Sequence, residues 1–155
     1  MESVTHVLLV DDDLESNSQN ERAFRRANFK KIKVTLNGGH ALVYLHQIQD
    51  AIRDSKIVII LDVDMPIMDG KEFLKNYNLT KEFCKDNILI VVQGNELSSR
   101  VIEDMQKLGV EYFVNKPVKI SQIQSMVNEY FSPAQEKAIV KKFPYNQDQR
   151  RAALG

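Results

Sequence analysis

Apolar residues along this chain gather in short continuous runs. The three clearest runs are residues 6–10, 57–61 and 88–92. Unbroken apolar runs of this length are typical of strands buried on both faces of a sheet, as in parallel sheets. Shorter segments at 33–36 and 112–114 complete a set of five predicted strands.

The segments between the predicted strands have the spacing of helices. Alternating strands and helices predict βα units, right-handed crossovers and an α/β fold with a doubly wound, five-stranded parallel sheet. The first helical segment, residues 14–27, is mostly polar, so its buried face is the least defined. The apolar positions at helical spacing are Leu14, Ala23, Phe24 and Ala27; Leu42, Leu45, Ile48 and Ile52; Phe73, Leu74 and Tyr77; Val101, Met105 and Leu108; and Ile120, Ile123, Val127 and Tyr130.

Polar and charged side chains follow most of the predicted strands. In an open parallel sheet the working site lies beyond the carboxyl ends of the strands, where the loops gather. Residues far apart in the sequence therefore meet at one edge of the sheet. They are Asp11, Asp12 and Asp13 after the first strand, Asp62 and Asp64 after the third, Gln93 and Gly94 after the fourth, and Asn115, Lys116 and Pro117 after the fifth.

A cluster of carboxylates at this edge indicates a divalent cation. Acids held close together repel one another and raise one another's pKa unless a cation screens them. Magnesium prefers a few carboxylate or carbonyl oxygens and keeps several waters, so it suits this set better than zinc. A carboxylate beside the metal is a competent nucleophile toward phosphorus, and the Lys116 ammonium can bind the phosphoryl oxygens. A cis bond before Pro117 would turn the lysine into the site.

Composition narrows the class of protein. Basic and acidic residues both number 21, so no net charge favours nucleic acid or an anionic membrane. The single cysteine, Cys84, permits no internal disulfide and fits a reducing cytoplasm. No apolar stretch approaches the length of a membrane span. We therefore expect a soluble, cytoplasmic domain.

Three motifs at the ends of the first, third and fifth strands carry a family resemblance. VLLVDDD at 7–13, IILDVDMPIMDG at 59–70 and YFVNKP at 112–117 resemble the receiver domain of two-component response regulators. The resemblance covers about residues 4–131 and implies a flavodoxin-like sheet with strand order 2-1-3-4-5. It implies that Asp62 is the phosphoacceptor and Lys116 the phosphate-binding lysine. The implied Mg²⁺ ligands are Asp12, Asp11, Asp62 and the backbone carbonyl of Asp64.

The chain departs from the family pattern at the switch position, where a Thr or Ser hydroxyl normally ends the fourth strand. Either Gln93 or Gly94 occupies this position, and neither has a hydroxyl. The aromatic switch residue falls on Phe113. We therefore expect phosphorylation to be retained and the conformational response to be weakened or rewired.

The resemblance implies a stand-alone receiver that takes a phosphoryl group from a histidine kinase or a histidine phosphotransfer protein. It would lose the group by self-catalysed hydrolysis, without being an enzyme otherwise. Output would pass to a partner through the face of the fourth helix, fifth strand and fifth helix, which also permits a homodimer, or through a phosphorelay. No DNA-binding domain or membrane partner is expected. Two alternatives stay open: a degenerate receiver that serves as an interaction module, and a haloacid-dehalogenase-type phosphohydrolase using Asp62 and Asp64.

The sequence divides into a receiver domain, residues 1–131, and a C-terminal extension, residues 132–155. The extension is basic, and Ala138, Ile139, Val140 and Phe143 could form a short amphipathic turn. We expect a short helix or a disordered tail packing against the body, and a docking arm for a partner is the alternative. The charged residues of the extension are Lys137, Lys141, Lys142, Arg150 and Arg151, against Glu136 and Asp148.

Overall fold

The computed structural model describes residues 4–132 of the chain. The predicted C-terminal extension lies outside the described residues, apart from Ser132. Strands and helices alternate along the described part of the chain. The strands are β1 (Val4–Val10), β2 (Lys31–Thr35), β3 (Lys56–Asp62), β4 (Ile88–Gly94) and β5 (Tyr112–Asn115). The helices are α1 (Leu14–Arg26), α2 (Gly38–Gln47), α3 (Gln49–Ile52), α4 (Gly70–Leu79), the 3-10 helix η1 (Lys85–Asn87), α5 (Ser99–Lys107) and α6 (Ile120–Tyr130).

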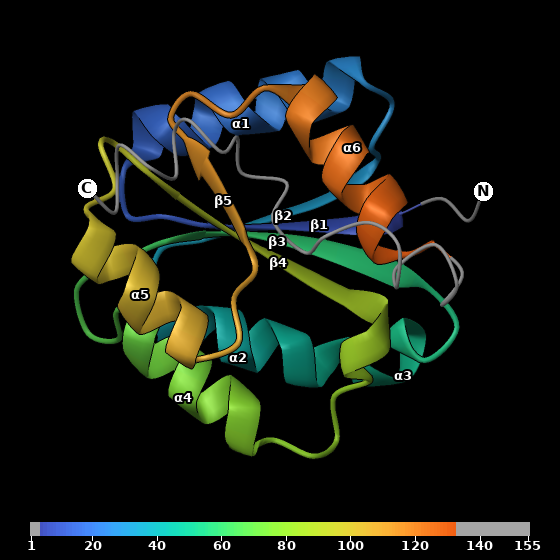
Figure 1. The fold of residues 1–155 in the computed structure, drawn as a ribbon. Coiled ribbons are helices and arrows are strands. Elements are labelled where there is room, and N and C mark those ends of the chain that lie inside the picture. Colours follow the sequence, from blue (N-terminus) through green and yellow to red (C-terminus); the bar gives the residue numbers. More distant parts are fainter. Residues whose placement is uncertain (1–3, 133–155) are drawn as a thin grey trace.

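All five strands are parallel and lie in the order β2-β1-β3-β4-β5, as predicted. Helices α1 and α6 cover one face of this sheet, and α2, α3, α4 and α5 cover the other (Figure 1). The strand order reverses next to β1, so the carboxyl ends of β1 and β3 lie side by side at the switch point of the sheet.

The continuous apolar strands supply two cores at once. On β3, Ile57, Ile59 and Leu61 face one layer of helices, while Val58 and Ile60 face the other. All five of these side chains are fully buried. Successive strand residues point to opposite faces, so a strand covered on both sides needs apolar residues at every position.

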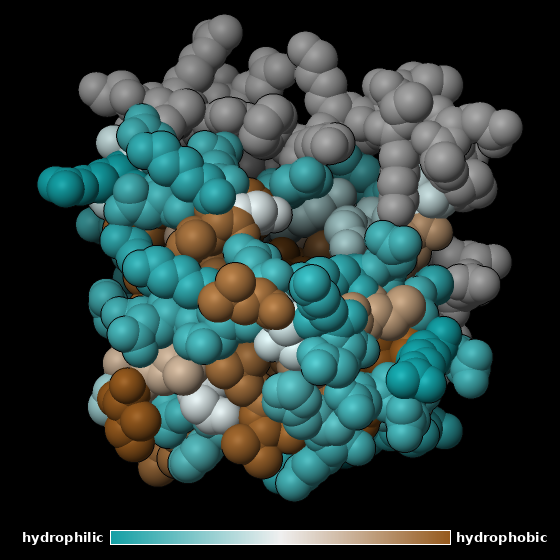
Figure 2. Space-filling view, turned by 90° about the horizontal axis from the view of Figure 1, so that it is seen from below, coloured by the Kyte–Doolittle hydropathy of each residue, from teal (hydrophilic) through white to brown (hydrophobic). Residues whose placement is uncertain are grey.

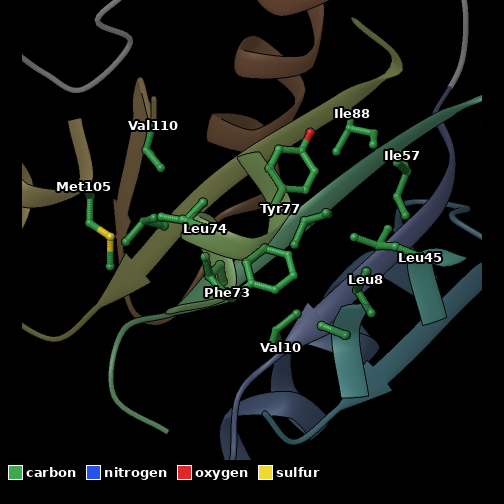
Figure 3. Packing of buried hydrophobic residues seen from close by; sticks show 14 of the residues in the cluster. Leu8, Val10, Leu45, Ile57, Phe73, Leu74, Tyr77, Ile88, Met105 and Val110 are labelled. Atoms are coloured by element: carbon green, nitrogen blue, oxygen red, sulfur yellow. The ribbon is translucent and has the colours of Figure 1, made fainter. Parts of the chain in front are cut away.

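The larger core lies between the sheet and helices α2, α4 and α5. Phe73 and Tyr77 of α4 stack at a centroid distance of 5.9 Å and pack among strand residues such as Leu8 and Ile57 (Figure 3). Seen from the side of α2 and α4, the surface has apolar patches broken up by hydrophilic ones (Figure 2). The apolar residues of α2 and α4 that face the sheet pack in the core, while others, such as Val43 and Leu79, are exposed.

Two sequence predictions about the helices are wrong. Leu14 was expected on the buried face of α1, but it is 70% exposed. The buried face of α1 is formed by Asn17, Asn20 and Phe24. The stripe from residues 42 to 52 was expected to form one helix, but the chain breaks at Ile48 into α2 and α3. A stripe of apolar residues cannot report a break between two short helices that bury the same side.

No helix within residues 4–132 is long and apolar enough to cross a bilayer.

Replacing Phe73 by alanine tests the larger core. Phe73 is fully buried, so Phe73→Ala is expected to lower the free energy of unfolding by about 3–5 kcal/mol in urea denaturation. Leu79→Ala is the matched control because Leu79 lies on the same helix but is 80% exposed. Its expected effect is within about 0.5 kcal/mol. Equal losses in the two variants would contradict this packing.

Candidate functional site

Three carboxylates meet where β1 and β3 end. Asp11 and Asp12 follow β1, and Asp62 is the last residue of β3. One carboxylate oxygen from each of the three lies within 4.8 Å of the others. Asp11 is fully buried, Asp62 is half-buried and Asp12 is exposed to solvent. The predicted acidic cluster is therefore brought together by the sheet, with an opening to solvent at Asp12.

Lys116 joins the cluster from the end of β5. Its Nζ donates to Asp11 Oδ2 at 2.8 Å and lies 3.3 Å from Asp62 Oδ1. The following Lys116–Pro117 bond is cis, as predicted. Burial alone would lower the pKa of Lys116, but the hydrogen bond to Asp11 and the charge of Asp62 raise it. Lys116 is therefore a fixed ammonium group beside Asp62.

The pKa of Asp62 is raised well above its ordinary value. Burial and the neighbouring charge of Asp11 raise its pKa to about 6, against the opposing effect of Lys116. A half-buried acid with a raised pKa beside a second acid and a lysine is a candidate for function. A bound divalent cation would stabilise the carboxylates together.

The start of α4 packs closely against the backbone of Asp62. The side chain of Asp69 caps α4 by accepting from the backbone N–H of Glu72 at 2.9 Å. Gly70 follows, and a Cβ at this position would lie 2.6 Å from the carbonyl oxygen of Asp62. Only glycine therefore lets α4 begin directly against the backbone of the acid.

A pocket of about 310 Å³ opens beside Asp62 and Lys116. Its volume is sufficient for a phosphoryl group and waters. Asp64 lines it and has an exposed side chain outside the three-carboxylate cluster. The other lining residues are Val63, Gly94, Asn95, Glu96, Leu97, Ser98 and Val101.

The structure distinguishes the two residues at the predicted switch position. Gly94 lines the pocket, and the space above it is filled by Leu97, whose Cδ2 would lie 2.5 Å from a Cβ at Gly94. Gln93 is buried and turns away from the pocket, donating from Nε2 to Asp11 Oδ2 at 3.1 Å. Phe113 is 2% exposed and packs in the larger core. Thus Gly94 is the residue that faces Asp62.

Helix α1 provides contacts that the sequence did not reveal. The side chain of Asp13 caps this helix, accepting from Glu15 N at 3.0 Å. Asn17 Nδ2 also donates to the backbone oxygen of Asp11 at 2.6 Å, and Asn20 Nδ2 donates to Gln93 Oε1 at 3.1 Å. The only available signal was the three-residue spacing of these two amides, which places them on one helix face.

Comparison with known proteins identifies the family. The model of the response regulator receiver domain matches residues 7–128, and the chain belongs to this family. It is 31% identical to the two-component response regulator ARR7 of Arabidopsis thaliana, over 77% of this chain and 59% of ARR7. It is 29% identical to ARR17 of the same plant, over 81% of this chain and 84% of ARR17. The chain thus spans little more than half of ARR7.

Solved structures agree on the fold. A two-component response regulator from Cytophaga hutchinsonii superposes with a TM-score of 0.72 at 23% identity, over 83% of this chain and 98% of that one. The CheX–CheY–BeF₃–Mg²⁺ complex from Borrelia burgdorferi gives a TM-score of 0.67 at 22% identity, over 83% and 90% of the two chains. At this level of identity, the likeness shows a shared fold.

The raised pKa of Asp62 predicts a pH-dependent cost to stability. Its carboxyl group is protonated more readily in the folded protein than in the unfolded chain, so its stabilising contribution is lost as pH rises from about 4 to about 6. In metal-free protein at pH 7, Asp62→Asn is expected to raise the free energy of unfolding by about 1–2 kcal/mol. The difference should vanish near pH 4.

Urea denaturation at several pH values measures this effect, with Asp64→Asn as the control because the Asp64 side chain is exposed. If the free energies of unfolding of wild type and Asp62→Asn differed by the same amount at every pH in this range, Asp62 would not have the raised pKa.

Proposed function

We propose that this receiver domain accepts a phosphoryl group on Asp62 in a Mg²⁺-dependent reaction and signals through that modification. The observation that carries the proposal is the position of Lys116 Nζ, which lies 2.8 Å from Asp11 and 3.3 Å from Asp62 at the mouth of a pocket. A nucleophile, an ammonium for the phosphoryl oxygens and an acidic metal site are therefore adjacent.

The residues present suit magnesium. The cluster offers three carboxylates and no histidine or cysteine, which is the oxygen-only chemistry that Mg²⁺ prefers. Asp12, Asp62 and the backbone carbonyl of Asp64 would hold the ion directly, and Asp11 would support it. Bound there, the ion neutralises the carboxylates and the negative charge of the transferring group.

The proposed transfer step uses Asp62 as the nucleophile and Lys116 as the phosphate-binding group. An Asp62 carboxylate oxygen attacks phosphorus, the phosphorus–nitrogen bond of a phosphohistidine breaks, and the released imidazole takes up a proton. Lys116 moves its hydrogen bonds to the phosphoryl oxygens as the group arrives. Later attack of water on phosphorus releases inorganic phosphate and restores Asp62. Beyond this self-modification and its reversal, we propose no enzymatic turnover.

Two exposed apolar side chains flank the acids and support a protein donor. Leu14 is 70% exposed at the start of α1, and Ile67 is 85% exposed in the loop that follows Asp62. Ile67 has a φ of 69°, a conformation that is unfavourable for a β-branched residue. An apolar residue held outward at a strained position beside the site suits contact with a partner. The donor in this proposal is a histidine kinase or a histidine phosphotransfer protein.

The output side of the proposal differs from the family pattern. Gly94 offers no hydroxyl to the phosphoryl group, and Leu97 fills the space above it. We therefore propose that the usual coupling from this position to Phe113 is weakened. The proposal includes output through the face of α5, β5 and α6, a homodimer on that face, and a role as a relay intermediate. It also includes action in the cytoplasm, which the single cysteine supports.

A receiver that acts only as an interaction module is the second candidate, and the missing hydroxyl at Gly94 is the observation that favours it. The haloacid-dehalogenase reading receives no support from the comparisons, because the family match is to receivers.

Intact mass spectrometry tests the first candidate. Incubation with acetyl phosphate and Mg²⁺ is expected to add one phosphoryl group to wild-type protein. The gain should be absent in Asp62→Ala and in a chelated sample, because the first lacks the nucleophile and the second lacks the cation. Asp69→Ala, altered at the cap of α4, should still gain the group. Equal labelling of Asp62→Ala would refute the assignment.

Charge substitution at Leu14 and Ile67 tests the docking of a protein donor. Leu14→Asp and Ile67→Asp should each slow transfer from a phosphohistidine protein by about tenfold, because each buries a charge at the contact. Transfer from acetyl phosphate should be unchanged, since this donor needs no docking surface. Leu79→Asp, at an exposed residue of α4, is the control. Equal slowing with both donors would instead indicate damage to the site.

A further inference from the structure

Gln93 lies under the acidic cluster and takes no direct part in the proposed transfer step. It pairs with Asp62 in the register between β4 and β3, and its side chain is 1% exposed. A buried amide that is not hydrogen-bonded costs free energy, so the partners of Gln93 decide its position. Both ends of its amide are occupied: Nε2 donates to Asp11 Oδ2, and Oε1 accepts from Asn20 Nδ2, each at 3.1 Å.

The chemistry of Asp11 fixes the direction of this chain of hydrogen bonds. An ionised carboxylate only accepts hydrogen bonds, so Gln93 must turn its NH₂ group toward Asp11. Its carbonyl oxygen then faces α1, and Asn20 must present its own NH₂ group to it. Asn20 is 3% exposed, so no bulk water can replace it. Only one orientation of the two side-chain amides therefore satisfies these hydrogen bonds.

Asp11 also accepts a hydrogen bond from Lys116, and the proposed reaction would remove this bond. Lys116 shares Asp11 Oδ2 with Gln93 but must also serve the phosphoryl group on Asp62. When Lys116 turns to that group, the Gln93 amide remains on Oδ2. Asp13 N donates to Oδ1 at 3.0 Å, and Asn17 holds the backbone oxygen. Thus Gln93 is the side-chain contact of Asp11 that the reaction leaves in place.

We propose that Gln93, supported by Asn20, is a positioning residue that fixes Asp11 for cation binding and links the acidic site to α1. The inference rests on the proposed Mg²⁺ site and deepens it. Hydrogen-bond partners of metal-binding carboxylates commonly change metal affinity by tenfold or more when removed. Helix α1 contacts the backbone of Asp11 through Asn17 and its carboxyl group indirectly, through Asn20 and Gln93. A shift of Asp11 would therefore change the contacts of α1.

The test measures Mg²⁺ affinity by NMR titration without a phosphoryl donor. Gln93→Leu is expected to raise the Kd for Mg²⁺ about tenfold, because it removes the donor at similar side-chain size. Asn20→Leu should raise it about threefold, since Gln93 then loses its support. The double variant should match Gln93→Leu alone, because Asn20 acts through Gln93. Gln124→Leu, at an exposed glutamine of α6, should not change the Kd.

Thermal unfolding of each variant separates positioning from a structural role. A folded Gln93→Leu protein that is less stable but binds Mg²⁺ as wild type does would overturn the inference. Additive effects of the two substitutions would overturn the role of Asn20. If Gln93→Leu does not fold, Gln93→Met, closest to glutamine in shape, gives the same comparison. Wild-type protein that binds no Mg²⁺ would overturn both the metal site and this inference. Wild-type binding with an unchanged Gln93 variant would overturn this inference alone.

Discussion

The carboxyl group of Asp11 is fully buried, and much of the site is arranged around it. An isolated buried carboxylate would be strongly destabilising, so its oxygens need donors. They come from Lys116, Gln93 and the backbone of Asp13. These donors lie just after β5, on β4 and just before α1, so satisfying one buried carboxyl group fixes the relative positions of three segments of the chain. The half-buried Asp62 is then held beside this charge, and its pKa rises to about 6.

The same constraint explains the weak apolar pattern of α1. This helix covers the sheet with Phe24 near its end, but at its start it faces the polar edge of the sheet. Asn17 and Asn20 are buried there because Asp11 and Gln93 require partners. A helix that covers both an apolar sheet and a buried acidic site cannot be apolar along its whole inner face. Its polar sequence is therefore a consequence of the site.

Most of the fold could be predicted from the sequence, because every strand buried on both faces leaves a continuous apolar run. Convergence of Asp11, Asp62 and Lys116 also followed from the sequence, since the carboxyl ends of parallel strands share one edge. The sequence did not show which of Gln93 and Gly94 lines the pocket. Consecutive strand residues point to opposite faces, and a shift of one residue in register exchanges them. Only the structure shows that Gly94 lines the pocket and that the Gln93 side chain bonds to Asp11.

The central claim is that Asp62 and Lys116 together bind a phosphoryl group beside Mg²⁺. The most direct measurement is a crystal structure of this protein with Mg²⁺ and beryllofluoride, which mimics the phosphoryl group. The account predicts beryllium on a carboxylate oxygen of Asp62, a fluorine within hydrogen-bonding distance of Lys116 Nζ, and Mg²⁺ bound by Asp12 and Asp62. Beryllofluoride on another residue, or Asp62 free of it at saturating concentration with Lys116 still on Asp11, would contradict the account.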